Sequence, residues 1–269
     1  SVTNTTAPVT IWALPTINAG NDVLVCSNNA TEQVTVTATG AGATGSYAWT
    51  APVAGVQNGV PFTASATGTF SVIGTDGNGC INYDTLQLTY STVPPANAGL
   101  DQAICFGQTA TFNATGLAPY NWSMTNYTNS GLTGAVNNSP VIVVTPTQPG
   151  TYTYQLNVSN GVGCTNTDAA TLTVWALPNV NAGVDQTICN ASPVILAGSG
   201  ALSYAWNNSV TNATPFFPSS TATYTVVGTD VNGCQNQDQV VVNVLPQPIV
   251  LGGLDQTICA GTPIILNAS

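Results

Sequence analysis

The chain has 269 residues and a formal net charge of −10, and it contains no lysine, arginine or histidine. Without histidine, no Ser-His or Cys-His nucleophile pair can form. Without cations, the surface cannot neutralise nucleic-acid phosphates or bind an anionic membrane through a basic patch. Its apolar runs are too short to span a bilayer. We therefore expect no nucleic-acid partner and no direct membrane insertion.

Seven cysteines reveal an internal repeat, the first feature to look for in a chain of this length. The intervals Cys80–Cys105, Cys164–Cys189 and Cys234–Cys259 are each 25 residues, whereas the other intervals vary. DQAIC at 101–105 recurs as DQTIC, and GTDGNGC at 74–80 recurs as GTDVNGC. The expected organisation is the end of a preceding repeat (1–13), three Ig-like repeats (14–92, 93–176 and 177–245) and the start of a further repeat (246–269).

Apolar residues alternate with polar ones, which predicts strands with one buried face. Leu86, Leu88 and Tyr90 show this pattern, as do the valines near 240–244. With turn residues between the runs, the sequence predicts an all-β fold of tandem β-sandwich domains. A Tyr-x-Trp motif in each repeat places a predicted core aromatic on a central strand; the alternative role is carbohydrate stacking. These tryptophans are Trp49, Trp122 and Trp206, and three further aromatics expected in the core are Phe70, Tyr152 and Tyr224.

The cysteines predict one disulfide in each domain. Pairing across a 25-residue interval would have to span a strand of about ten residues, roughly 33 Å, whereas bridged Cα atoms lie within about 7 Å. We therefore expect pairing within each repeat, as Cys26–Cys80, Cys105–Cys164 and Cys189–Cys234, with Cys259 unpaired. Free buried thiols are the alternative. Disulfides indicate an oxidising, extracellular location.

The 25-residue interval also includes the junction between repeats, where Pro94, Pro178 and Pro248 each follow a cysteine by 14 residues. A junction of constant length that contains proline favours a fixed angle between domains and an extended rod; a short hinge is the alternative. Trp12 and Trp175 flank junctions. We expect them to pack between domains, and contact with extracellular polysaccharide is the alternative.

Aspartates recur near the end of each repeat and at the start of the next. Because Asp and Asn bind backbone groups in tight turns, turn formation is the first interpretation. The second is calcium binding, since Ca²⁺ takes six to eight oxygen ligands. We expect no cofactor and no catalytic site, with calcium as the alternative. The calcium candidates are Asp22, Asp76, Asp84, Asp185, Asp230 and Asp238, and Asp101, Asp168 and Asp255 occupy matching positions.

The pattern NAGxDQxIC, then Tyr-x-Trp, then GTDxNGC, resembles the PKD-like and Ig-like repeats of very large secreted surface proteins of Bacteroidota, such as gliding-motility adhesins of the SprB type. The resemblance implies Ig-like sandwiches, export by the type IX secretion system and a place on the bacterial cell surface. The middle repeat departs from the pattern, because Asn160 replaces the aspartate. In these bacteria Asp84-Thr85-Leu86 also resembles an O-glycosylation acceptor sequence, with Thr85 as the acceptor.

We expect the chain to be a non-catalytic stalk segment of an extracellular adhesin or filament, which presents a distal tip and bears tension. Its first partners are then neighbouring repeats of the same chain. Two alternatives remain open at this stage. The domains are carbohydrate-binding modules, or they assemble laterally into a fibre through sheet edges that have no lysine to protect them.

Overall fold

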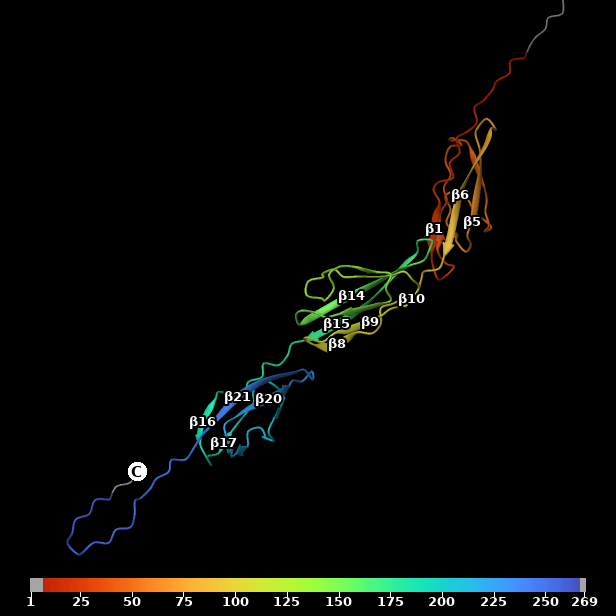
Figure 1. Cartoon of the computed structure of the whole chain (residues 1–269). Helices are drawn as coiled ribbons and strands as arrows, with labels where there is room; N and C mark the ends of the chain where they lie inside the picture. The colour runs from red at the N-terminus through yellow and green to blue at the C-terminus, as the bar shows by residue number, and fades with distance from the viewer. Residues whose placement is uncertain (1–6, 267–269) are drawn as a thin grey trace, which may run out of the picture. The chain divides into compact units, whose positions relative to one another are not determined.

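The computed structural model describes residues 7–266, and every regular element among them is a β-strand (Figure 1). The predicted all-β fold is therefore confirmed. No described residue belongs to a helix that could cross a membrane. Residues 1–6 and 267–269, which fall in the two predicted partial repeats, lie outside the described residues.

Chain contacts divide the molecule into two compact units. The first contains residues up to Gln102 together with Thr109–Thr145 and Tyr152–Leu172. The second contains Ala103–Gln108, Pro146–Thr151 and the chain from Thr173 onward. We keep the terms first repeat (14–92), second repeat (93–176) and third repeat (177–245) for the three sequence segments.

The first repeat forms a four-stranded sheet in the order β1-β6-β5-β3 and a two-stranded sheet of β2 and β4. β1 runs parallel to β6, with Val23 opposite Leu88 and Cys26 opposite Ser91. The other neighbours are antiparallel. The strands are β1 (Val23–Cys26), β2 (Gln33–Val34), β3 (Ser46–Thr50), β4 (Phe62–Thr63), β5 (Gly68–Thr75) and β6 (Ile81–Ser91).

The third repeat has the same topology. Its larger sheet has the order β16-β21-β20-β18, and its smaller sheet pairs β17 with β19. β16 runs parallel to β21, and this pair ends with Cys189 opposite Leu245. The strands are β16 (Gln186–Cys189), β17 (Val194–Ile195), β18 (Ser203–Trp206), β19 (Pro215–Phe216), β20 (Ala222–Thr229) and β21 (Gln235–Leu245).

The second repeat has a five-stranded sheet in the order β12-β11-β14-β15-β8, because its longer insertion adds β12 beside β11. Two further pairs are β13 with β9 and β10 with β7. The strands are β7 (Ala96–Asn97), β8 (Gln102–Cys105), β9 (Ala110–Asn113), β10 (Thr115–Gly116), β11 (Tyr120–Ser123), β12 (Val136–Asn137), β13 (Val141–Val144), β14 (Gly150–Ser159) and β15 (Thr165–Trp175).

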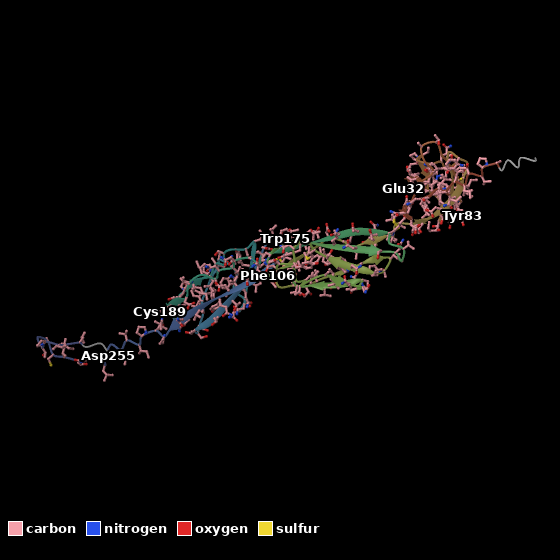
Figure 2. The ribbon with its side chains drawn as sticks, turned by 90° about the horizontal axis from the view of Figure 1, so that it is seen from above. Glu32, Tyr83, Phe106, Trp175, Cys189 and Asp255 are labelled. Carbon is pink, nitrogen blue, oxygen red and sulfur yellow. A yellow bond between two sulfur atoms is a disulfide. The ribbon has the colours of Figure 1, made fainter. Side chains whose placement is uncertain are left out.

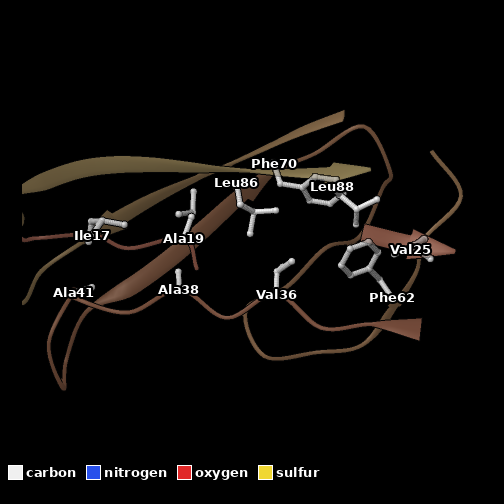
Figure 3. Close-up of a cluster of buried hydrophobic side chains, with 12 residues drawn as sticks. Ile17, Ala19, Val25, Val36, Ala38, Ala41, Phe62, Phe70, Leu86 and Leu88 are labelled. Atoms are coloured by element: carbon white, nitrogen blue, oxygen red, sulfur yellow. The ribbon is translucent and has the colours of Figure 1, made fainter. Parts of the chain in front are cut away.

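The cores lie between the larger and smaller sheets, where alternate residues of each strand point inward. Figure 3 shows the core of the first repeat, with Phe70, Leu86 and Leu88 from the larger sheet facing Val36 and Phe62. An aromatic pair recurs in each repeat. The ring centroids are 5.5 Å apart for Phe62–Phe70, and 5.2 Å apart for both Phe112–Tyr154 and Phe216–Tyr224. Such contacts favour one packing arrangement over others.

The tryptophan prediction is confirmed fully for one repeat and in part for two. Trp122 is fully buried, whereas Trp49 and Trp206 are half-buried and pack against the cores of their repeats. In all three the indole N–H finds an acceptor: the Ser139 carbonyl for Trp122, and asparagine side chains for the other two.

The expected core aromatics include one wrong assignment. Phe70 and Tyr224 are buried as predicted, but Tyr152 is only half-buried. The buried position belongs to Tyr154, which lies ten residues before Cys164, just as Phe70 lies ten residues before Cys80. Its hydroxyl donates to the buried carbonyl of Ser130 in the insertion. A shift of two residues keeps the same strand face, so alternation alone could not separate the two tyrosines.

Candidate functional site

Two disulfides form in the structure, and both join one repeat to the next. Cys26 of the first repeat bonds to Cys164 of the second, and Cys105 of the second bonds to Cys234 of the third. Both have a Cα–Cα distance of 5.5 Å. The predicted pairs Cys26–Cys80, Cys105–Cys164 and Cys189–Cys234, and with them the prediction of one disulfide per domain, are therefore wrong. Cys80, Cys189 and Cys259 are thiols in the structure, so the expectation of an unpaired Cys259 agrees with it.

The strand topology explains the correction. In the first repeat, Cys80 immediately precedes β6, whereas Cys26 lies beside Ser91, the last residue of β6. The 11 residues of β6 extend over roughly 36 Å, far beyond the reach of a disulfide. Since β1 is parallel to β6, the two cysteines of one repeat lie at opposite ends of the same strand. The strand-length argument that excluded the 25-residue pairs therefore excludes pairing within a repeat as well.

One half of each junction is a hairpin turn that ends in Gly-Cys. Before Cys164, the Asn160 N–H donates to the Cys164 carbonyl and the Asn160 Oδ1 accepts the Cys164 N–H at 2.9 Å. Asp230 makes the same contacts with Cys234. The intervening Gly163 has a φ of 104°, which only glycine adopts readily. Because Asp and Asn both offer Oδ1, the aspartate missing from the second repeat leaves the turn intact.

The other half of each junction is the end of the parallel strand. Cys26 ends β1 and Cys105 ends β8. The next backbone N–H continues the parallel pairing, since Ser27 donates to the Ser91 carbonyl and Phe106 donates to the Trp175 carbonyl at 2.8 Å. These hydrogen bonds hold the strand-end cysteine beside the last residue of its own repeat, where the turn of the following repeat meets it.

The first junction, the contacts around Cys26–Cys164, is polar. The Asn160 side chain donates from Nδ2 to the Ser91 Oγ at 2.9 Å and to the Thr92 carbonyl at 3.1 Å. Its Oδ1 is already occupied by the turn, so one side chain shapes the turn and binds the preceding repeat. On the strand-end side, the Tyr90 hydroxyl donates to the carbonyl of Ser27.

The second junction, the contacts around Cys105–Cys234, is more apolar. Phe106, Trp175 and Leu177 lie there, each a little more than one-third exposed. Figure 2 shows Phe106 and Trp175 close together at this position. The first two of these, together with Gly233 beside Cys234, replace the asparagine clamp of the first junction with apolar side chains and a bare glycine; Phe106, Leu177 and Gly233 line a shallow hollow next to the disulfide.

The junction prolines belong to the repeat that follows them. Pro94 and Pro178 are buried, and their carbonyls accept from the side-chain Nδ2 of Asn166 and Asn236. Asn82 makes the same bond with Pro15 in the first repeat. Pro248, by contrast, is exposed and lies outside any strand. Sequence reasoning missed these asparagines, although each stands two residues before a recurring aspartate and could have been found by that spacing.

The recurring aspartates all bind backbone amides, which agrees with the turn interpretation. Eight of the ten acidic side chains do so. Asp22, Asp101 and Asp185 accept from the central strand of their repeat. Asp84, Asp168 and Asp238 accept from Ala19, Ala98 and Ala182. Asp76 and Asp230 bind their own hairpin turns. Within residues 7–266, no three His, Cys, Asp or Glu side chains gather as a metal site.

Two of these hydrogen bonds change the acidity of a carboxyl group. The Ala19 N–H, with a smaller contribution from the Thr85 N–H, lowers the pKa of Asp84 from its ordinary value of 3.8. The Ala182 N–H, followed by that of Gln239, lowers the pKa of Asp238 in the same way. The N–H groups stabilise the charged form. In the second repeat, burial raises the pKa of Tyr154, so its hydroxyl stays protonated as a donor.

The surface positions singled out in the sequence have different settings. Trp12 is more exposed than Trp175 and lies in a segment without regular structure. Thr85 is exposed on β6, opposite Ser71 of β5. The O-glycosylation of Thr85 stays a prediction, as does the polysaccharide contact of the two tryptophans.

Comparison with known proteins finds a family match over the second repeat. Residues 98–174 match the family described as "K319L-like, PKD domain". Curated proteins give no match. Among solved structures, the I-band fragment I67-I69 from titin is 11% identical, with 87% of this chain and 100% of that chain covered and a TM-score of 0.44. Sidekick-1 immunoglobulin domains 1-5 are 15% identical, with 87% and 60% covered and a TM-score of 0.35.

Proposed function

We propose that the chain is a non-catalytic structural segment of an extracellular adhesion protein, which holds a distal tip away from the cell and bears tension. The observation that supports this function is the pairing of the cysteines between successive repeats. A disulfide inside a domain strengthens that domain alone. A disulfide between domains instead transmits force from one domain to the next, as a load-bearing series requires.

The composition and the bridges are consistent with an extracellular location. Disulfides persist in oxidising compartments and are rare in the reducing cytosol. The resemblance of the repeat to Bacteroidota surface proteins gives the finer form of the proposal: a cell-surface stalk exported by the type IX secretion system and serving gliding motility. The PKD-like match over residues 98–174 supports the repeat class on which this form depends.

The acidic side chains favour a structural over a catalytic role. A glycosidase needs two carboxyl groups that face a substrate across a gap of several ångströms. Here eight of the ten acidic side chains are already hydrogen-bonded to backbone amides, and the same three positions recur from repeat to repeat. Their repetition is that of a structural motif.

Single-molecule stretching tests the proposed function. The chain is pulled from its two ends with and without a reductant. Because the bridges remove residues from the path that carries force, the oxidised chain should reach its limiting length far earlier than the reduced one. Equal limiting lengths in the two conditions would contradict a load-bearing role for the bridges.

Carbohydrate binding is the second candidate, and the exposed indoles of Trp12 and Trp175 favour it. A glycan array separates the two candidates. Saturable binding by the intact chain that is lost in Trp12→Ala or Trp175→Ala would support a binding module. Trp122→Phe, altered in a buried core, serves as the control that should leave such binding unchanged.

A further inference from the structure

Cys80 and Cys189 are thiols at positions that form disulfides elsewhere in the same chain. The Asp76 N–H donates to the Cys80 carbonyl, and Asp76 Oδ1 accepts the Cys80 N–H at 2.8 Å. Asp230 holds Cys234 in the same way. Cys80 therefore presents the hairpin-turn half of a junction, already in the form that bonds at Cys234.

Cys189 presents the opposite half. It ends β16 beside Leu245, and the following Asn190 N–H donates to the Leu245 carbonyl at 2.9 Å. The Ser192 N–H closes a turn on the Cys189 carbonyl, as the Gln108 N–H does on the Cys105 carbonyl. Cys189 is exposed, whereas its bonded counterpart Cys105 is only partly so. The strand-end half is thus formed without its partner.

The two halves match each other as well as they match the second junction. The turn halves read GTDGNGC at 74–80 and GTDVNGC at 228–234, and the strand-end halves read DQTIC at 185–189 and DQAIC at 101–105. Both turns carry aspartate where the first junction has Asn160. A contact between residues 74–80 and 185–189 of different molecules would therefore repeat a contact that the chain already makes.

We propose that Cys80 and Cys189 are complementary half-junctions, and that each forms a disulfide with a repeat of this same type that carries the other half. A second copy of this chain carries both halves, so copies join head to tail through Cys189 of one and Cys80 of the next. The inference rests on the junction geometry and is independent of the proposed function.

The chemistry is thiol–disulfide exchange with an external disulfide such as oxidised glutathione. The Cys189 thiolate attacks oxidised glutathione, which forms a mixed disulfide and releases one reduced glutathione. The Cys80 thiolate of the partner then attacks the Cys189 sulfur, which forms the protein disulfide and releases the second. Two protein thiols are oxidised, and one glutathione disulfide is reduced.

Two variants with one remaining unpaired thiol each test the proposal. Cys80→Ser with Cys259→Ser leaves Cys189, and Cys189→Ser with Cys259→Ser leaves Cys80. Neither variant touches a bonded cysteine, so both should keep the native fold. They are mixed in equal amounts in a glutathione redox buffer, and the dimers are identified by mass spectrometry of non-reduced peptides, which also confirms that Cys26–Cys164 and Cys105–Cys234 persist.

If the halves are complementary, the Cys80–Cys189 heterodimer should exceed either homodimer several-fold and take clearly more than the one-half share that random pairing gives. The same mixture in concentrated urea, where the turn and strand end are lost, should return to the random share. A random share under native conditions, or an excess of either homodimer, would overturn the proposal. Asp76→Ala, which removes the acceptor of the turn, should lower the native excess.

Discussion

The two junctions share one covalent design and differ in everything around it. In both, a cysteine at the end of a parallel strand meets a cysteine at the end of a hairpin turn, with the same 5.5 Å separation of Cα atoms. The first is completed by hydrogen bonds from Asn160 to Ser91 and Thr92. The second is completed by the partly exposed side chains of Phe106 and Trp175.

This difference separates what positions the disulfide from what surrounds it. The strand end and the turn are built from backbone hydrogen bonds that recur in each repeat, so they place the sulfur atoms regardless of the neighbouring side chains. The side chains across the junction are therefore free to change from polar to apolar. The predictions below test this separation, from the largest expected effect to the smallest.

The largest effect concerns the limiting length under force. Removing both bridges, by replacing Cys26, Cys164, Cys105 and Cys234 with serine, should lengthen the path between positions 26 and 234 by the 138 residues that the first bridge spans. At full extension this is roughly 480 Å. Stretching experiments on the oxidised parent and the variant measure it directly.

Removing only one bridge should change the limiting length very little, because the other bridge offers an alternative route. The spans differ by nine residues, 138 against 129, so Cys26→Ser with Cys164→Ser adds only about 30 Å, and Cys105→Ser with Cys234→Ser adds nothing. Independent gains from the two variants would show that the cysteines pair within repeats.

The second effect concerns the repeat between the junctions, which has no internal disulfide and depends on its core. Trp122→Ala should destabilise the second repeat by about 3–5 kcal/mol, the usual cost of removing a buried large aromatic side chain. Hydrogen exchange of β11 and β14 localises the change, and urea denaturation measures it. Trp49→Ala, at a half-buried position, should cost clearly less; equal costs would contradict the burial difference.

The third effect distinguishes the turn from the clamp at Asn160. Asn160→Asp keeps the Oδ1 acceptor of the turn but loses donation to Ser91 and Thr92, at a cost of about 1 kcal/mol. Asn160→Ala loses both and should cost more. Reduction of Cys26–Cys164 by a small thiol should accelerate in this order, while Cys105–Cys234 in the same molecules serves as the unchanged control.

The smallest effect is a pH dependence in the first and third repeats. Because Asp84 and Asp238 have lowered pKa values when folded, their stabilisation is present above the ordinary value of 3.8 and is lost as the pH falls through the folded pKa. Asp84→Asn should flatten this loss in the first repeat. Urea denaturation at several pH values measures the slope, and an unchanged slope would contradict the role of the Ala19 hydrogen bond.

Much of the fold could be predicted because alternation depends on local side-chain chemistry. Leu86 and Leu88 show which face of β6 is buried, and the structure confirms it. Alternation does not say which strand lies beside which, or in which direction. The parallel pairing of β1 with β6 moves Cys26 to the far end from Cys80, and no residue pattern within 14–92 reveals that direction. The disulfide partners were lost there.

The staggered spans of the two bridges have a final consequence, which is redundancy. Cys105 lies between Cys26 and Cys164, and Cys164 lies between Cys105 and Cys234, so the two closed loops overlap. Any single break of the main chain between positions 26 and 234 leaves one intact covalent route between the two ends. With bridges confined to single repeats, one cut in a linker would divide the chain. The overlap makes the chain tolerant of a single cut, whether by a protease or by force.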